Sequence, residues 1–216
     1  MKHLIIIGAR GFGRVVHDLA VDMPQYQKEF DIKGFLDDKA DALVGYDNYP
    51  PIISSVEAYD IQPDDVFVCA LGDVHYKKHY SEIILNKGGH FINVIHPSAH
   101  IGTNVQIGIG CIIAGNVWID SDTKIDDFVT IQGGALLGHD SRVGKWSMID
   151  SMCFLGGFVC LEELVTMHTH STVVPHLTIH SNATINVASA VIRDVKPNTT
   201  VMGNPARERI VPKINK

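Results

Sequence analysis

The chain has 216 residues, of which 45% are hydrophobic and 19% are charged, a balance typical of a globular protein with a sizeable core. Its formal net charge of −6 at pH 7 gives no reason to expect nucleic acid or a membrane surface as a partner. The apolar run after Met1 is too short for a signal peptide, and no stretch approaches the roughly 20 apolar residues of a membrane helix. A cytoplasmic location is therefore expected.

Up to about residue 94 the sequence alternates strand-like and helix-like segments. Strands are expected over residues 3–9, 32–38, 65–73 and 90–95, and helices over residues 13–23 and 74–88. The first helix is expected to stop before Pro24, and the second at Gly88 and Gly89. Such alternation is typical of an α/β unit, so residues 1–94 are predicted to form a small Rossmann-like domain with a parallel sheet.

Three glycines lie between the first expected strand and the first expected helix, in the stretch GARGFGR. Backbone amides at such a turn, together with the helix N-terminus that follows, can bind a phosphate group. The spacing departs from the G-x-G-x-x-G pattern of dinucleotide sites, because Arg10 stands where a second glycine would be found. The stretch is therefore only weak evidence for NAD.

A period of six residues begins at residue 95. Every sixth position from Ile95 to Val191 is aliphatic or methionine without an insertion, and the residue four positions after each is mostly small. This pattern predicts a solenoid in which each hexapeptide makes one short strand, with its aliphatic side chain inward, and one corner. Three strands would close a triangular coil, so that residue i lies beside residue i+18, about 4.8 Å along the axis. Residues 95–196 would then form about 5–6 coils.

One polar pair in this region is a candidate for chemistry. His139 lies two residues after the inward-facing Leu137, so its side chain is expected to point outward. Asp140 follows directly, and a carboxylate near an imidazole can fix its tautomer and raise its basicity, as a general base requires. Counting eighteen residues onward leads to Gly157, where the missing side chain leaves a backbone N–H open to a ligand. A base above an open amide suits acyl transfer, whereas a merely solvated histidine is the alternative.

Taken together, these stretches resemble the sialic acid O-acetyltransferase family of sugar acyltransferases, which includes bacterial enzymes that N-acetylate nucleotide-linked 4-amino sugars. The likeness is carried by IIIGARGFGRVV, GFLDD, ALGD, IHPSAHIG, LGHDSRVG and VMGNPARERI, which span almost the whole chain in the family's order. The fold that this resemblance implies is the N-terminal α/β domain followed by a left-handed parallel β-helix of hexapeptide repeats.

The resemblance also implies an activity, namely acetyl transfer from acetyl-CoA to the amine of a nucleotide-linked sugar in bacterial glycan biosynthesis. It implies a homotrimer, with acetyl-CoA between neighbouring prisms and no acyl-enzyme intermediate. By this likeness His139 is the general base, Asp140 supports it, and the Gly157 amide holds the thioester oxygen. The residues implied for acetyl-CoA are Gly156, Gly157, Gly203, Asn204, Pro205 and Arg207, with Arg209 as a further candidate. Those implied for the nucleotide sugar are Gly8, Gly11, Phe12, Gly13, Arg14, Asp37, Asp38, Gly72, Asp73 and Lys77.

Two departures from the family pattern leave the acyl group and the acceptor open. Met148 stands where many members have a second histidine that contacts the acyl group or its donor, so this contact is lost or replaced. Phe12 stands where the aminosugar enzymes usually have histidine, so a sugar O-acetyltransferase that acts on a hydroxyl is an alternative. A trimeric nucleotide-sugar-binding scaffold without catalysis is a hypothesis of another class.

A cluster of histidines suggests the alternative hypothesis of a metal site like that of γ-type carbonic anhydrases. Its members are His168, His170, His176 and His180. Zinc needs three or four ligands that converge within about 2.1 Å of one point, whereas these positions fall on different faces of the coil. No metal is therefore expected. We interpret these histidines as solvated or interface residues, and a contact with the CoA diphosphate is left open.

The remaining expectations concern the cysteines and the C-terminus. The cysteines form no CxxC pair and are expected to be buried free thiols rather than disulfides or zinc ligands. Pro197 is expected to end the strand ladder, because proline cannot donate to it. Residues 197–216 would then form a tail that packs on the prism.

Overall fold

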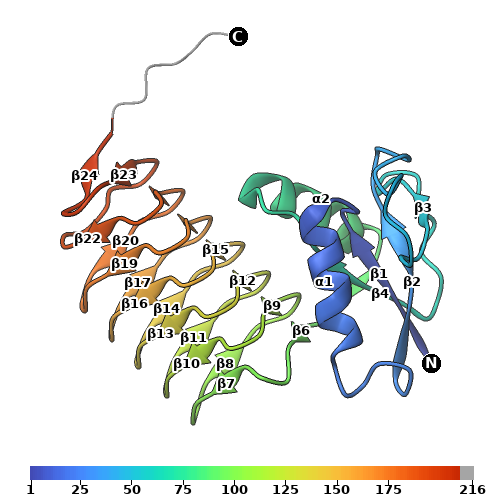
Figure 1. Ribbon diagram of the computed structural model, residues 1–216, viewed down its shortest axis with the longest axis horizontal. Helices are drawn as coiled ribbons and strands as arrows, with labels where there is room; N and C mark the ends of the chain where they lie inside the picture. The colour runs from blue at the N-terminus through green and yellow to red at the C-terminus, as the bar shows by residue number, and fades with distance from the viewer. Residues whose placement is uncertain (210–216) are drawn as a thin grey trace, which may run out of the picture.

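The computed structural model describes residues 1–209 and folds them into an α/β unit attached to a long β-helix (Figure 1). The elements of the first unit are β1 (Lys2–Ile7), α1 (Gly11–Val21), β2 (Phe30–Leu36), β3 (Ile52–Ser54), β4 (Asp65–Cys69), α2 (Val74–Asn86) and β5 (His90–Phe91). Their strands are all parallel and lie in the order β3-β2-β1-β4-β5. The small Rossmann-like sheet predicted from the sequence is confirmed.

Two details of this unit differ from the prediction. The short strand β3 was not expected, because it has three residues and directly follows two prolines. The single strand expected over residues 90–95 is wrong, since β5 pairs with β4 whereas β6 (Val94–Ile95) pairs with a strand of the β-helix. Asn93 lies between them, donating from Nδ2 to the Gly108 carbonyl at 2.8 Å and accepting the Cys111 N–H at 2.9 Å. This side chain anchors the point at which the chain enters the first coil.

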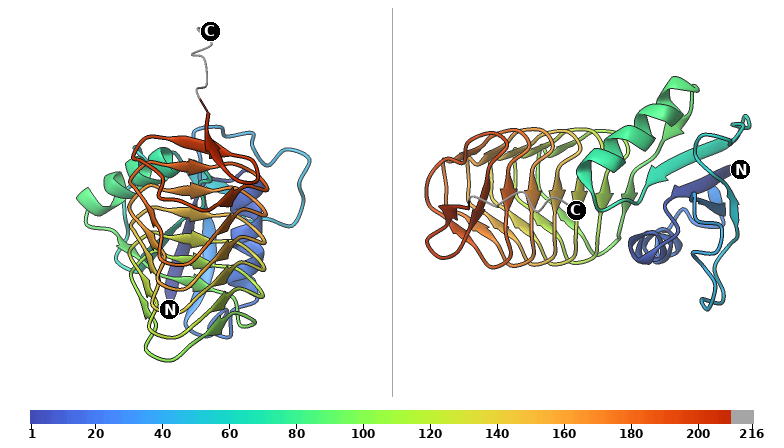
Figure 2. Two further views of the ribbon diagram at one scale, coloured as in Figure 1. Left: turned by 90° about the vertical axis from the view of Figure 1, so that its left-hand side faces the viewer. Right: turned by 90° about the horizontal axis from the view of Figure 1, so that it is seen from above.

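From β6 onward a two-residue strand recurs every six residues. The strands stack into the successive coils that Figure 2 shows. These strands are β6, β7 (His100–Ile101), β8 (Gln106–Ile107), β9 (Ile112–Ile113), β10 (Trp118–Ile119), β11 (Lys124–Ile125), β12 (Thr130–Ile131), β13 (Leu136–Leu137), β14 (Arg142–Val143), β15 (Met148–Ile149), β16 (Phe154–Leu155), β17 (Cys160–Leu161), β18 (Thr166–Met167), β19 (Thr172–Val173), β20 (Thr178–Ile179), β21 (Thr184–Ile185) and β22 (Ala190–Val191). They form three parallel sheets, and Leu136 pairs with Trp118 on one side and Phe154 on the other. The predicted spacing of eighteen residues and the left-handed parallel β-helix are confirmed.

The interior of the prism follows from the hexapeptide pattern. The second residue of most strands points inward, so that Ile119, Leu137 and Leu155 are fully buried. Small residues fill the corners, where their hydroxyl groups satisfy carbonyls of the next coil. Ser141 Oγ, for example, donates to the Gly156 carbonyl at 3.2 Å. Ile101 is 37% exposed, because β7 is the edge strand of its sheet.

The corners of the coils carry residues with positive φ. Along the corner after β13 these are Asp140 at 56°, Phe158 at 59° and His176 at 63°, one per coil. The left-handed region costs a residue with a Cβ about 1–2 kcal/mol. Asparagine and aspartate tolerate it best, so an aromatic residue in this position calls for a physical reason.

The α/β unit is fixed to the first coils by shared apolar contacts. Ile112 of β9 belongs to the same buried cluster as Val16 of α1. Phe128 packs edge to face on Phe91, with ring centroids 4.9 Å apart. One face of α2 is buried as well, so the unit and the prism form one packed body.

The strand ladder continues past Pro197, and the expectation that it ends there is wrong. Strand β23 (Thr200–Met202) pairs in parallel with β21, and β24 (Arg207–Glu208) pairs antiparallel to β23. Pro197 falls in the connection between strands, where no ladder hydrogen bond is required of it. The part of the expected tail from residue 210 onward lies outside the described residues.

All four cysteines are free thiols, as expected. Three are buried, whereas Cys160 is only half-buried, because it occupies the outward position of β17. Across residues 1–209, neither helix is long and apolar enough to cross a membrane.

Candidate active site

The corner after β13 carries His139 and Asp140. His139 Nδ1 lies 2.8 Å from Asp140 Oδ2. An ionised carboxylate can only accept, so Nδ1 donates to it, and a neutral imidazole in this orientation has its lone pair on Nε2. The His139 side chain is 54% exposed, which leaves it accessible to a ligand. This is the arrangement of an oriented base.

Gly157 lies against the imidazole, one coil further on, as the spacing of eighteen residues predicted. A Cβ built on Gly157 would come 2.9 Å from His139 Nε2 and 3.0 Å from its Cε1. A Cβ on Gly138 would come 2.6 Å from the Gly157 nitrogen. Among residues 1–209, no carbonyl or side chain accepts a hydrogen bond from the Gly157 N–H. The two glycines therefore leave a free backbone donor beside the nitrogen that could act as base.

Aromatic residues extend this corner, in positions for which the sequence pattern predicted no role. The Phe158 ring lies edge to face with the His139 imidazole, at a centroid distance of 5.2 Å. The His176 ring stacks on Phe158 at 4.8 Å, with 8° between the planes. The signal available in the sequence was the same spacing of eighteen residues, which leads from Asp140 to Phe158 and on to His176.

Packing within the protein explains why other residues expected near the acyl donor are of their particular types. Met148 lies on β15 and is 4% exposed, so its side chain does not face the surface that carries His139. Gly156 is buried, and a Cβ there would come 2.6 Å from Pro175. The turn from Gly203 to Arg207 is held against the last coil by a hydrogen bond from the Ala206 N–H to the Ala190 carbonyl, at 2.8 Å.

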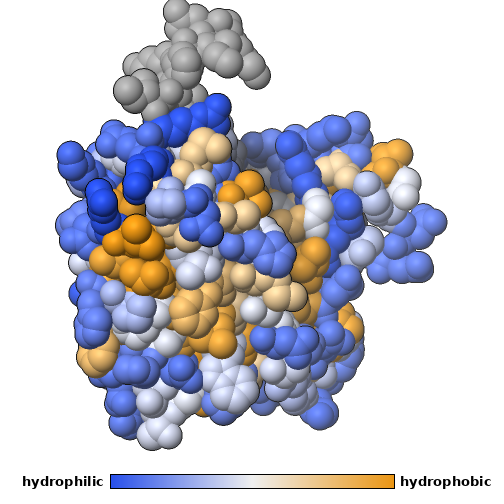
Figure 3. Space-filling model, turned by 60° about the vertical axis from the view of Figure 1, so that its left-hand side comes forward, coloured by the Kyte–Doolittle hydropathy of each residue, from blue (hydrophilic) through white to orange (hydrophobic). Residues whose placement is uncertain are grey.

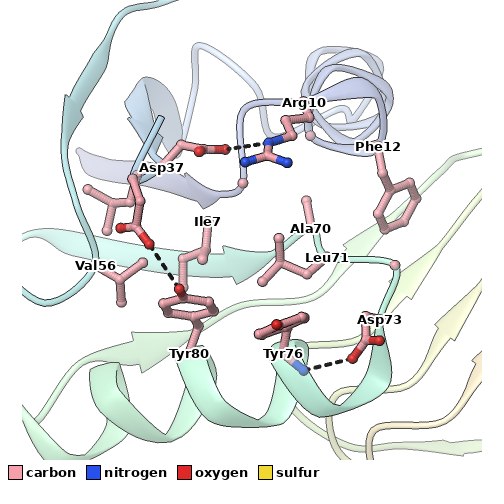
Figure 4. Close-up of a pocket in the computed structure, with 15 residues that line it drawn as sticks. Ile7, Arg10, Phe12, Asp37, Val56, Ala70, Leu71, Asp73, Tyr76 and Tyr80 are labelled. Atoms are coloured by element: carbon pink, nitrogen blue, oxygen red, sulfur yellow. Dashed lines mark hydrogen bonds and ion pairs between the residues drawn. The ribbon is translucent and has the colours of Figure 1, made fainter. Parts of the chain in front are cut away.

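A second candidate site is a cavity of about 470 Å³ at the carboxyl ends of the strands of the α/β sheet. Figure 4 shows the glycine loop, with Arg10 and Phe12, across this pocket from Tyr76 and Tyr80 of α2. Its lining residues are Ile7, Gly8, Arg10, Phe12, Gly13, Leu36, Asp37, Asp38, Val56, Ala70, Leu71, Gly72, Asp73, Tyr76 and Tyr80. The helix α1 begins at Gly11 with no acidic residue in its first turn, so its N-terminus favours an anionic ligand.

The glycines of the loop are explained by close backbone approach. A Cβ on Gly13 would overlap the carbonyl oxygen of Gly8. Because Gly13 has no Cβ, α1 can lie directly against the end of β1. Gly8 has a φ of +96°, which favours a residue without a Cβ.

The carboxylates of the pocket have different tasks. Asp37 accepts the Ala9 N–H on Oδ2 and the Lys39 N–H on Oδ1, each at 2.9 Å, so both oxygens hold the loop. Asp73 caps α2, where its Oδ1 accepts two backbone N–H groups. Asp38 accepts the Tyr80 hydroxyl at 2.9 Å, and this bond, with burial as a smaller cause, raises the pKa of Tyr80 to about 12.

Three residues predicted for the nucleotide-sugar site do not line the pocket. Lys77 is 1% exposed and points toward the prism, where its Nζ donates to Thr130 Oγ1 and to the Ser147 carbonyl. Burial lowers the pKa of Lys77 to about 8. The Arg14 guanidinium stacks over the Tyr46 ring, 3.5 Å from its centroid, and Gly11 is exposed at the start of α1. Assigning Lys77 to the pocket was therefore wrong, because its position on α2 directs it the other way.

The histidines of the C-terminal coils do not converge. His168 pairs with Asp150, and His180 pairs with Glu162, each at 3.0 Å, whereas His176 stacks on Phe158. Within residues 1–209, no group of three or more His, Cys, Asp or Glu side chains is arranged to hold a metal ion.

Comparison with known families divides the chain a few residues before the point at which the β-helix begins. The model of the PglD N-terminal domain matches residues 3–84, and that of the GMPPB C-terminal domain matches residues 90–191. The acetyltransferase domain of PglB from Neisseria gonorrhoeae FA1090 superposes with a TM-score of 0.87 at 24% identity, covering 97% of this chain and 100% of that chain. PerB from Caulobacter crescentus superposes with a TM-score of 0.86 at 22% identity, covering 97% of this chain and 98% of that one. The chain thus joins a region similar to the PglD N-terminal domain to a run of hexapeptide repeats.

Curated relatives agree with this class. GDP-perosamine N-acetyltransferase of Escherichia coli O157:H7 is 29% identical over 147 residues, which is 66% of this chain and 66% of that protein. An acyl-[acyl-carrier-protein]–UDP-N-acetylglucosamine O-acyltransferase of Pseudomonas aeruginosa is 30% identical over 95 residues, which is 44% of this chain and 37% of that protein. The matched stretch therefore spans just under two thirds of the first relative and about a third of the second. The chain is therefore similar to hexapeptide-repeat sugar acyltransferases.

Proposed function

We propose that this protein transfers an acetyl group from acetyl-CoA to the amine of a nucleotide-linked amino sugar, in bacterial glycan biosynthesis. The observation that carries the proposal is the His139 imidazole, fixed by Asp140 and lying against Gly157 with its free N–H. The names of the relatives support it: PerB was solved with CoA and GDP-perosamine, and the PglB domain with acetyl coenzyme A.

The residues suggest a direct transfer. His139 Nε2 takes a proton from the sugar amine as the amine attacks the thioester carbon, while Asp140 stabilises the imidazolium that forms. The Gly157 N–H donates to the carbonyl oxygen as this oxygen gains negative charge. The carbon–sulfur bond then breaks, and the imidazolium returns its proton to the departing CoA thiolate. General-base assistance contributes about 10²–10⁴-fold to the rate, and positioning of the two substrates contributes most of the remainder.

The acceptor would be held through its nucleotide in the pocket of the α/β unit. Arg10 and the N-terminus of α1 suit its diphosphate, and the carboxylate of Asp38 can accept from an N–H or O–H group of the ligand. Of the residues expected to hold acetyl-CoA, we retain the turn of Gly203, Asn204, Pro205 and Arg207, which lies on the surface of the last coil. We do not retain Gly156, because packing explains it.

The active unit would be a homotrimer, with the donor between neighbouring prisms. Trp118, Leu136 and Phe154 are 47%, 37% and 40% exposed and lie in register on adjacent strands of one sheet. Apolar areas are visible on the surface of the β-helix in Figure 3. Such a stripe favours burial against another copy of the chain.

The test is thiol release from acetyl-CoA with nucleotide-linked amino sugars and plain sugars as acceptors. We expect release that needs an amine and falls at least about a hundredfold in His139→Ala. His3→Ala is the matched control, because His3 forms a similar 2.7 Å pair with Asp31, on β1 and β2, and is 39% exposed. Equal rates for the two variants would refute the role of His139.

A hydroxyl acceptor is the second candidate, favoured by the apolar Phe12 in the pocket lining. Release with plain sugars alone would establish O-acetyl transfer instead. Binding of a nucleotide sugar without thiol release from any acceptor would favour the non-catalytic scaffold.

A further inference from the structure

The Phe158 ring occupies a position that its backbone does not favour. Phe158 has a φ of 59° and is 48% exposed, so it gains only part of the burial that an aromatic side chain can offer. Asp140, eighteen residues earlier, and Asn104 and Asp122, further back along the same corner, are residue types that tolerate this conformation. An exposed aromatic residue held in a strained conformation beside a candidate base suggests a function for the ring.

Contacts of the ring point to that function. The His139 imidazole is held at Nδ1 by Asp140 and is limited on the side of Nε2 by Gly157. Phe158 closes a third side, edge to face with the imidazole at 5.2 Å. His176 stacks in parallel on Phe158 at 4.8 Å and so restricts the rotation of the phenyl ring.

We infer that Phe158, with His176 stacked on it, is a positioning residue that keeps the His139 imidazole bonded to Asp140 with Nε2 against Gly157. Without the ring, the half-exposed imidazole can rotate about its side-chain bonds and leave the Asp140 carboxylate. On this inference Phe158 acts through His139 rather than on a substrate. The inference rests on the proposed function only insofar as His139 is the base.

Phe158→Asn separates the ring from the backbone conformation. Asparagine tolerates positive φ, so the substitution removes the ring without adding strain, and folding should be retained. We expect kcat to fall about three- to tenfold, the factor that corresponds to the energy of one aromatic pair, with KM for both substrates unchanged. Phe158→Tyr keeps the ring and should retain kcat. Leu164→Asn is the control, because Leu164 has the same φ of 59° on another corner, away from His139.

The ¹⁵N NMR spectrum of the His139 ring, recorded on the full chain without substrates, tests the positioning role directly. This spectrum would not change if Phe158 only stabilised the fold. The wild type should show the single tautomer with the proton on Nδ1, and Phe158→Asn should show a mixture of tautomers. A wild-type spectrum together with a wild-type kcat in Phe158→Asn would overturn the inference. A reduced kcat with an unchanged spectrum would also overturn it, since the ring would then act on a substrate directly.

The same spectra keep this inference apart from the proposed function. If His139→Ala retained full activity while Phe158→Asn still mixed the tautomers, the base assignment would fail and the positioning role of Phe158 would stand.

Discussion

A single methyl group on Gly157 should remove activity while leaving the fold intact. The Cβ of Gly157→Ala would come 2.9 Å from His139 Nε2, closer than real Cβ contacts, and 3.0 Å from Cε1, tighter than most of them. Gly157 does not have a positive φ, so alanine suits its backbone, and the half-exposed imidazole can move away. The cost in stability should therefore stay below about 1 kcal/mol, as for most exposed substitutions. The displaced base, however, should lower kcat about a hundredfold, the loss expected from a misplacement of about 1 Å.

Initial rates of thiol release, measured beside thermal unfolding, test this prediction. Gly115→Ala is the matched control, because its Cβ would come 3.2 Å from Nδ1 of His96. His96 lies about one coil before Gly115, as His139 lies one coil before Gly157. This variant should have wild-type rates. If Gly157→Ala kept its rate within about threefold of wild type, neither the crowding of His139 nor its role as base could be maintained.

Three further outcomes are expected. Asp140→Asn should lower kcat at least about tenfold with unchanged unfolding, because the amide cannot hold Nδ1–H of His139 as strongly; the test is steady-state kinetics. Tyr80→Phe should raise KM for the nucleotide sugar about tenfold without changing kcat, since Asp38 loses the 2.9 Å bond that orients it. Lys77 has a folded-state pKa of about 8, below its value of 10.5 in the unfolded chain, so the unfolded state binds more protons between these pH values. The stability of the wild type relative to Lys77→Met should therefore rise by about 3 kcal/mol from pH 8 to 10.5, as measured by urea unfolding, and a flat difference would contradict the burial of the amine.

The parts of the site that lie in the β-helix could be predicted because one coil has a fixed length. A spacing of eighteen residues is a spatial contact in this fold, so His139 and Gly157 could be brought together from the sequence alone. The same arithmetic leads to Phe158 and His176, whose importance depends on ring orientation, which no periodicity encodes.

In the α/β unit, the error was to place Lys77 of α2 in the pocket beside Gly72 and Asp73. The buried positions of α2 are Val74, Lys77, Ser81 and Ile84, spaced as one helical face, and Lys77 on this face reaches the prism. Tyr76 and Tyr80, four residues apart, lie on the face toward the pocket. This helical spacing was present in the sequence, but which face meets the pocket depends on how the unit docks on the coils.

The exposure of His139 bears on the proposed assembly. In a single chain the imidazole is 54% exposed, whereas a general base works best where water is excluded and the field of its partners is strong. Leu136 and Phe154 of the exposed apolar stripe lie three residues before His139 and Gly157, each in the same coil as its partner. A second chain bound to this stripe would bury the apolar surface and would also shield His139 from water. The trimer that we propose thus accounts for both features, and the rate per chain should fall once dilution separates the chains.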